Sequence, residues 1–318
     1  MPISRQRYLI SQPGTYYLDL WRNTSVQERR LHRQFQVCHV RGGLIKDSNN
    51  ESVVRMNVAP DTWVTRTAVR RGKKLWDKHI KEGTEGLEMN TIKPKYHDYK
   101  VLLNPAQPFS IASSANLKVV DAAGSEIPYG EWKYSTYVSE DVDWSDATIG
   151  SGAPGTQNRD ADQFTACIVG AHTPQGSNPN AWDQIGLIQS WLDSRPAADP
   201  SGNPYFLQQD IDDMTADPLV NLFDEADASD EILEYLATDN DRPPYDEDAV
   251  WGTITPTANI GDNLQRVAMA ATQSGAGQIA SLNGFSAICG LVQVHVTQGS
   301  TTGDVEIILD VETKGAKI

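Results

Sequence analysis

The residues best placed to bind another molecule are a row of cations between Asp61 and Lys81. This run, DTWVTRTAVRRGKKLWDKHIK, gathers its basic side chains on one half of a helical wheel drawn at about 100° per residue. The basic half consists of Arg66, Arg70, Arg71, Lys73, Lys74, Lys78 and Lys81. A fixed row of cations attracts polyanions. We therefore expect its partner to be either a nucleic acid or an acidic protein surface.

The other half of the same run is apolar and predicts how the helix is held. It contains Val64, Ala68, Val69, Gly72, Leu75, Trp76, His79 and Ile80. Asp61 or Thr62 can accept a hydrogen bond from a free N–H of the first turn, so we predict a helix over about 61–83. Gly72 lies on the apolar side, where a missing side chain lets another part of the chain approach closely.

An acidic segment further along the chain is a possible counterpart. Residues 210–248 contain 15 acidic side chains and one basic one, whereas residues 1–100 contain 19 basic and 10 acidic ones; the whole chain carries a net charge of −15. The candidates for acidic contacts between subunits are Asp210, Asp212, Asp213, Asp224, Glu225 and Asp227. Two interpretations stay open: contact between copies of the chain, or solvated faces without a specific partner. The acidic spacing does not match a calcium loop.

The remaining reactive side chains form no recognisable catalytic pattern. The six histidines are scattered and lack HxxxH or HExxH spacing, so no zinc site is predicted. There is no GxSxG or Walker A motif, and the GAGQIA run at 275–280 lacks the strand–helix–strand unit of a dinucleotide site. We predict no catalytic residue, no metal and no cofactor.

One aromatic run supports an alternative function. In EWKYSTYVSEDVDW, the side chains of Trp132, Tyr134, Tyr137 and Trp144 could form a platform for a sugar. The alternative is therefore a carbohydrate-binding module or a carbohydrate-active enzyme. The alternation of the same run is also typical of a half-buried strand. For Trp63, Trp76, Trp182, Trp191 and Trp251 we expect core positions first and interfaces second.

The elements that must position these residues are mostly strands. Runs rich in β-branched and aromatic residues, bounded by turn formers, predict strands at 15–20, 35–45, 52–58, 97–103, 117–120, 132–138, 164–169, 250–255, 264–269, 287–296 and 304–311. Two further helices are predicted at about 181–193 and 218–238. The absence of a βαβ rhythm favours a mainly β, antiparallel sandwich. We expect one elaborated jelly roll over 1–318 with helical insertions; a double jelly roll, which needs about 16 strands, is the alternative.

Cellular location is constrained by the cysteines and by hydropathy. Cys38, Cys167 and Cys289 are widely spaced in apolar runs, which predicts three reduced core residues. No run approaches the ~18 apolar residues of a membrane span, and the first residues lack a secretory h-region. We expect no transmembrane segment and no secretion.

Three stretches carry a resemblance to a known family. They are TYYLDLWRNTSVQERRLHRQFQVCHV, NVAPDTWVTRTAVRRGKKLWDKHI and CGLVQVHVTQGSTTGDVEIILDVETKGAK. In these stretches the chain resembles the jelly-roll major capsid proteins of small circular single-stranded DNA viruses and phages. The resemblance implies synthesis in a host cytoplasm or nucleus and self-assembly into an icosahedral virion shell. Its partners would be other copies of the chain and packaged DNA, bound without sequence specificity.

The chain departs from that family at its start. Coat proteins of this kind usually begin with an Arg- and Lys-rich arm that neutralises the genome, but the first 21 residues here contain only Arg5 and Arg7. The genome would then meet a folded basic surface, a separate basic protein or an internal membrane.

Overall fold

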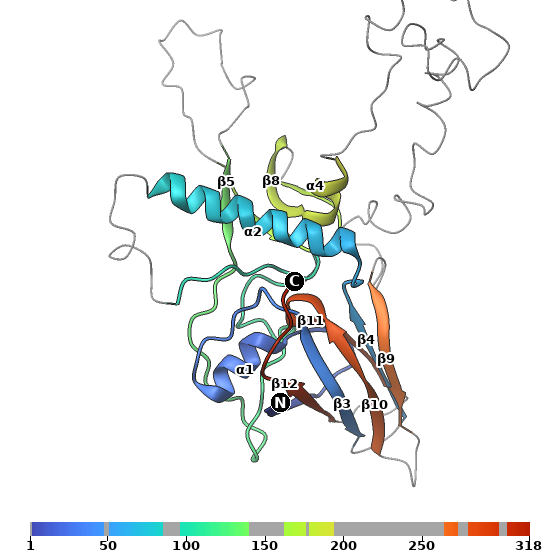
Figure 1. Ribbon diagram of the computed structural model, residues 1–318. Coiled ribbons are helices and arrows are strands. Elements are labelled where there is room, and N and C mark those ends of the chain that lie inside the picture. The colour runs from blue at the N-terminus through green and yellow to red at the C-terminus, as the bar shows by residue number, and fades with distance from the viewer. Residues whose placement is uncertain are drawn as a thin grey trace, which may run out of the picture. The chain divides into compact units, whose positions relative to one another are not determined.

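The computed structural model describes residues 2–47, 51–84, 96–139, 162–175, 178–193, 264–272, 279–298 and 304–318 (Figure 1). The chain divides into two compact units, one of Met1–Trp191 with Trp251–Ile318 and one of Leu192–Val250. The second unit lies almost wholly outside the described residues.

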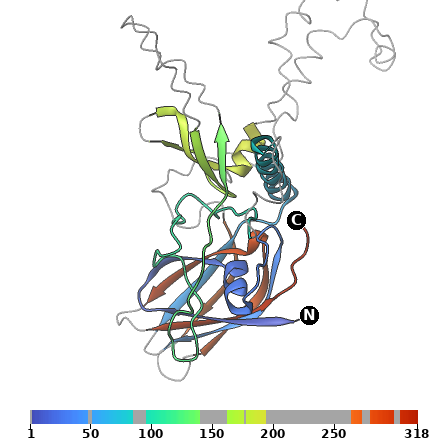
Figure 2. The same cartoon turned by 90° about the vertical axis from the view of Figure 1, so that its left-hand side faces the viewer.

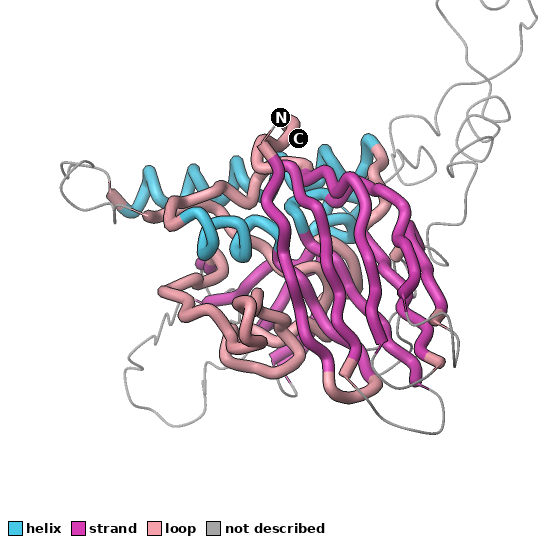
Figure 3. The backbone as a smooth tube through the Cα atoms, turned by 90° about the horizontal axis from the view of Figure 1, so that it is seen from below, coloured by secondary structure: helices cyan, strands magenta, loops and turns pink. Residues whose placement is uncertain are grey.

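Two antiparallel four-stranded sheets form a sandwich. The strands are β1 (Ile3–Ile10), β2 (Gly14–Asp19), β3 (Cys38–Asp47), β4 (Ser52–Val58), β9 (Gln265–Ala271), β10 (Ile279–Ala287), β11 (Leu291–Gln298) and β12 (Val305–Glu312). Sheet A has the order β1-β12-β3-β10, and sheet B has the order β2-β11-β4-β9. Figure 3 shows strands of the sandwich side by side. The prediction of a mainly β, antiparallel sandwich is confirmed.

The pairing joins the two ends of the chain. Strand β1 pairs with β12, β2 with β11, β3 with β10, and β4 with β9. The sandwich is thus built from residues 3–58 and 265–312. Residues 59–264 are an insertion between two strands, β4 and β9, that are hydrogen-bonded neighbours.

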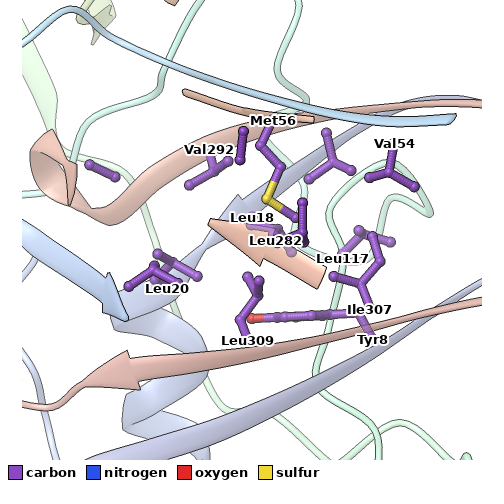
Figure 4. Packing of buried hydrophobic residues seen from close by; sticks show 14 of the residues in the cluster. Tyr8, Leu18, Leu20, Val54, Met56, Leu117, Leu282, Val292, Ile307 and Leu309 are labelled. Atoms are coloured by element: carbon purple, nitrogen blue, oxygen red, sulfur yellow. The ribbon is translucent and has the colours of Figure 1, made fainter. Parts of the chain in front are cut away.

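One apolar core fills the space between the sheets. In β12 the side chains of Val305, Ile307, Leu309 and Val311 are fully buried and alternate with partly exposed ones, as expected for a strand with one face inward. They pack in one cluster with buried residues of the other seven strands. Figure 4 shows Met56, Leu282 and their neighbours within this cluster.

Strand β1 and helix α1 (Leu20–Glu28) were not predicted, because polar residues are buried in both beside apolar ones. Ser4 and Gln6 point inward on β1, where the Ser4 hydroxyl donates to Gln27 and Gln6 Nε2 donates to Thr24 Oγ1 at 2.8 Å. Helix α1 buries Arg22 and other polar side chains. Polar and apolar residues share the buried side of each segment, which obscures the periodicity.

A sharp turn separates two strands that the sequence merges into one. The predicted strand 287–296 is the end of β10, the short 3-10 turn η4 (Ile288–Gly290) and β11. Cys289 and Gly290 have φ values of 57° and 66°, which lets the chain cross from sheet A to sheet B. The two C-terminal strands, β11 and β12, exist as predicted but lie in different sheets rather than pairing with each other.

Within its described residues, the insertion contains a third sheet and two helices. Sheet C has the order β5-β6-β8-β7, formed by β5 (Thr136–Ser139), β6 (Asp162–Cys167), β7 (Thr173–Gln175) and β8 (Asn178–Gly186), with β6 and β8 parallel. The helices are α2 (Trp63–Gly83) and α4 (Leu187–Asp193). The helix predicted at 61–83 is therefore confirmed. That predicted at 181–193 is wrong in its first half, because residues 178–186 pair with neighbouring strands.

Other sequence predictions have mixed outcomes. Segments 97–103 and 117–120 are extended but make only isolated bridges, such as Leu102 with Cys167, instead of a ladder. The strand predicted at 250–255 and the helix at 218–238 lie outside the described residues. Cys38, Cys167 and Cys289 are free and buried, as predicted.

Candidate interaction surface on helix α2

Helix α2 begins with a side-chain cap. Thr62 Oγ1 accepts a hydrogen bond from the backbone N–H of Thr65 at 3.2 Å, and the Thr62 carbonyl accepts from Arg66 N at 3.0 Å. Of the two predicted caps, Thr62 is the one used. The Asp61 carboxylate instead binds the Arg66 guanidinium through two hydrogen bonds of 2.5 and 2.8 Å. This contact holds the pKa of Asp61 below its usual value.

The apolar face of α2 rests on an aromatic cluster. Trp76 is 5% exposed, and its ring centroid lies 4.8 Å from that of His97 and 5.6 Å from that of Tyr99. Tyr99 is fully buried, and its hydroxyl is 2.8 Å from that of Tyr137 on β5. Figures 1 and 2 show α2 beside β5 and α4, in agreement with these contacts. The helix is thus fixed by packing along its length.

Gly72 sits where α2 comes closest to its neighbours. A Cβ added at this position would lie 2.7 Å from Tyr99 Oη and 2.8 Å from Leu187 Cδ2 of α4. The close approach inferred from the sequence is confirmed, although the partners are side chains. Leu75 departs from the prediction, because it is 40% exposed and not part of the packed face.

Two cations of the basic face form ion pairs with acidic neighbours. Arg66 pairs with Asp61, and Lys73 Nζ lies 2.5 Å from Asp77 Oδ2. Lys73 also lies over the ring of Phe35, 5.7 Å from its centroid. These two cations flank the face and are neutralised locally. Two of the seven predicted basic residues are therefore weaker candidates than the wheel alone suggested.

The centre of the basic face is exposed to solvent. Arg70, Arg71, Lys74, Lys78 and Lys81 are all exposed. Arg70 Nε donates to the backbone oxygen of Ile318 at 3.0 Å. Within the described part of the chain, Lys74 and Lys81 make no ion pair. Cationic charge is thus concentrated along one line of the helix.

Trp63 is the residue of this surface that the sequence misplaced. We expected a core position, but its side chain is 64% exposed at the start of α2. Its ring meets that of Trp191 on α4 edge-to-face, with centroids 5.0 Å apart and planes at 90°. Trp191 is only 6% exposed, so Trp63 packs on a buried side chain. The helical wheel held a signal, because Trp63 falls on the same side as Lys74 and Lys81.

The acidic candidates cannot be placed against this surface. Asp210, Asp212, Asp213, Asp224, Glu225 and Asp227 all lie outside the described residues. Their contact with the basic face stays a prediction.

A second set of charged residues is buried where β2 meets α1. Asp19, 1% exposed, accepts hydrogen bonds from Arg22 N and from Gln34 Nε2, each at 3.0 Å. Arg22 Nη2 donates to the Leu117 carbonyl at 2.5 Å, and Gln34 Oε1 accepts from Val101 N at 2.7 Å. Burial raises the pKa of Asp19. These residues are closed to solvent, and their contacts cap α1 and brace it against distant segments, which is a structural role.

The aromatic platform proposed for sugar binding is not exposed. Trp132, Tyr134 and Tyr137 are 7%, 9% and 0% exposed, and Trp144 lies outside the described residues. Trp132 instead lies beneath Lys100, whose ammonium is 4.8 Å from the ring centroid. The feature that favoured a carbohydrate function is therefore a buried packing layer in the described part of this run.

Two searches of the described residues were negative. No group of three or more His, Cys, Asp or Glu side chains there could hold a metal ion. Among the helices of that part, none combines the length and the apolar character needed to cross a membrane.

Comparisons with known proteins assign no family. The chain gives no significant match to a protein-family model, a curated protein or a solved structure.

Proposed function

We propose that this chain is a coat-protein subunit that assembles with copies of itself into an icosahedral shell around a DNA genome. One observation carries the proposal: the order in which the sandwich strands pair. Counted along the chain, the eight strands run 1-8-3-6 in sheet A and 2-7-4-5 in sheet B. That order arises when one long antiparallel hairpin, pairing first with last, is rolled into two sheets. That order supports a jelly roll, an architecture used by viral capsid domains.

Fold alone does not select a function, since jelly rolls also occur in lectins and cupins. The coat-protein hypothesis is further supported by the three sequence stretches that resemble capsid proteins. A single elaborated roll is favoured over a double one. The described strands outside the sandwich form sheet C, whose parallel pair β6–β8 does not belong to a second roll of antiparallel strands.

The outer face of sheet A has the layout of an assembly contact. Leu44 on β3 is 45% exposed and lies opposite Ile308 on β12, while Ile279 on β10, 63% exposed, is the diagonal neighbour of Leu44. Ion pairs flank these apolar residues, among them Arg5–Asp310 and Arg41–Glu312. Exposed apolar side chains with charged neighbours are compatible with a protein interface, which taken as a whole is about as apolar as the rest of a protein surface.

Assembly is tested on the purified chain. We expect size-exclusion chromatography with light scattering, followed by negative-stain electron microscopy, to show closed particles of uniform diameter. A chain that stays monomeric at high concentration, at low and at high salt, would contradict the shell proposal.

Substitutions then locate the contact. Leu44→Glu with Ile279→Glu should abolish particles while the circular dichroism of the subunit stays unchanged. Met269→Glu is the matched control, because Met269 is also an exposed apolar strand residue (51%) but lies on sheet B. Loss of particles only in the Met269 variant would move the contact to sheet B.

A further inference from the structure

A row of exposed side chains runs along α2. It is formed by Trp63, Arg70, Lys74, Lys78 and Lys81, and we call it the α2 ridge. At 100° per residue these positions fall within about 80° of the wheel, and at 1.5 Å per residue they span about 27 Å. The cations follow one another at intervals of about one helical turn.

Two lysines of this ridge, Lys74 and Lys81, keep their charge unpaired within the described residues. Arg66 and Lys73, at its flank, are neutralised by Asp61 and Asp77. A linear polyanion laid along the helix would therefore meet unneutralised cations on the solvent side.

The aromatic end of the ridge distinguishes one polyanion from another. Trp63 is 64% exposed and is held edge-to-face on the buried Trp191. Because that contact is perpendicular, it uses at most one face of the Trp63 ring. An indole fixed in this way is a ready stacking surface for a flat ligand. An acidic polypeptide would form ion pairs with the lysines without using the Trp63 ring.

We propose that the α2 ridge binds single-stranded nucleic acid, with phosphates along Arg70, Lys74, Lys78 and Lys81 and a base stacked on Trp63. Cations that track a backbone next to an aromatic stacking surface are how proteins bind single strands without reading sequence. A duplex keeps its bases stacked internally and could use only the cations. The inference extends the proposed function, since it names the genome-facing site, but it is tested on unassembled subunits.

The assay is fluorescence anisotropy of a labelled oligothymidylate titrated with the Leu44→Glu/Ile279→Glu chain, in which assembly is blocked. Trp63→Leu should weaken binding by about 5- to 150-fold, the range for losing one base–aromatic stack. It should leave the salt dependence unchanged. Lys74→Gln with Lys81→Gln should weaken binding and make the slope of log K against log salt shallower by about 1.4, or 0.7 for each lost cation.

The matched control removes two exposed cations elsewhere, by Lys46→Gln with Arg266→Gln. It should change affinity and slope little. Circular dichroism of every variant checks that α2 still forms. Three outcomes would overturn the inference: a Trp63→Leu effect below about twofold, a duplex that binds at least as tightly, or zero-length crosslinks from Lys74 to residues 210–227 in a chain that does not bind the oligonucleotide.

The two proposals fail separately. Particles that assemble from subunits unable to bind the oligonucleotide would refute the α2 ridge and leave the shell standing. Subunits that bind the oligonucleotide through Trp63 but never form particles would refute the shell and leave the α2 ridge standing.

Discussion

Replacing Gly72 with alanine should destabilise the subunit, although alanine is the better helix former. In an exposed helix interior this change gains about 1 kcal/mol. Here the new Cβ would lie 2.7 Å from Tyr99 Oη and 2.8 Å from Leu187 Cδ2. Neither neighbour can move away freely, because Tyr99 and Leu187 are 1% and 4% exposed and the Tyr99 hydroxyl is hydrogen-bonded to Tyr137.

The size of the effect follows from the competing contributions. Overpacking a close-packed site costs about 1–3 kcal/mol. Displacing Tyr99 also weakens its hydrogen bond with Tyr137, at about 1 kcal/mol. After subtracting the helix-propensity gain of about 1 kcal/mol, we expect a net loss of about 1–3 kcal/mol in the free energy of unfolding.

The measurement is urea unfolding followed by circular dichroism, on subunits kept from assembling. Lys74→Ala, on the exposed side of the same helix, is the control and should stay within about 0.5 kcal/mol of the parent. Tyr99→Phe removes the nearer contact atom. The double variant Gly72→Ala/Tyr99→Phe should therefore lose less stability than the two single variants added together. A gain of about 1 kcal/mol for Gly72→Ala would refute the close approach, since helix propensity would then be acting alone.

Three further predictions concern the sandwich. The three cysteines are buried and burial raises the pKa of each thiol, so a thiol reagent should label none of them in the native subunit and all three in guanidinium chloride; rapid native labelling would be inconsistent with this packing. Gly290→Ala should cost more than about 2 kcal/mol in urea unfolding, because φ is +66° and the new Cβ would lie 2.6 Å from Trp21; a neutral result would argue against this turn. Burial and the nearby Arg55 lower the pKa of His295, so the folded state disfavours its protonation and stability should fall as the pH drops below about 6.5. His295→Gln should reduce this loss of stability at low pH, by a fraction of a kcal/mol because the ring is partly exposed. If the pH dependence of stability is the same in this variant, another group causes it.

Local patterns predicted those elements whose burial is apolar and periodic. Helix α2 and strand β12 are of this kind, with buried residues at helical spacing in one and at every second position in the other. The same reasoning failed for β1 and α1, where the polar side chains of Ser4, Gln6 and Arg22 are buried in hydrogen bonds beside the apolar core. Pairing of β1 with β12 joins residues about 300 positions apart, and no local pattern encodes such a contact.

The sequence predicted where the candidate site lies, but not which of its cations are neutralised by acidic neighbours. The helical wheel identified the basic face of α2, but it was drawn without regard to the acidic neighbours that pair with two of its cations. Asp77 lies four residues after Lys73, a spacing at which side chains of a helix meet, so this neutralisation was open to sequence reasoning. The exposure of Trp63 was open to it as well, because the wheel places this residue on the side of Lys74 and Lys81. Its contact with Trp191 was not, because Trp191 lies on another helix far along the chain.

The setting of the α2 ridge changes what a basic segment can do. A disordered arm must be ordered when it binds, and that entropy is subtracted from its affinity. Helix α2 is instead capped by Thr62 and packed through Gly72 and Trp76, so its cations are already held in a line. Each contact between the ridge and a nucleic-acid strand should therefore cost less conformational entropy than the same contact made by a disordered arm. The same rigidity limits the ridge to ligands that can follow a straight path of about 27 Å, which a single strand can do by adjusting its own backbone.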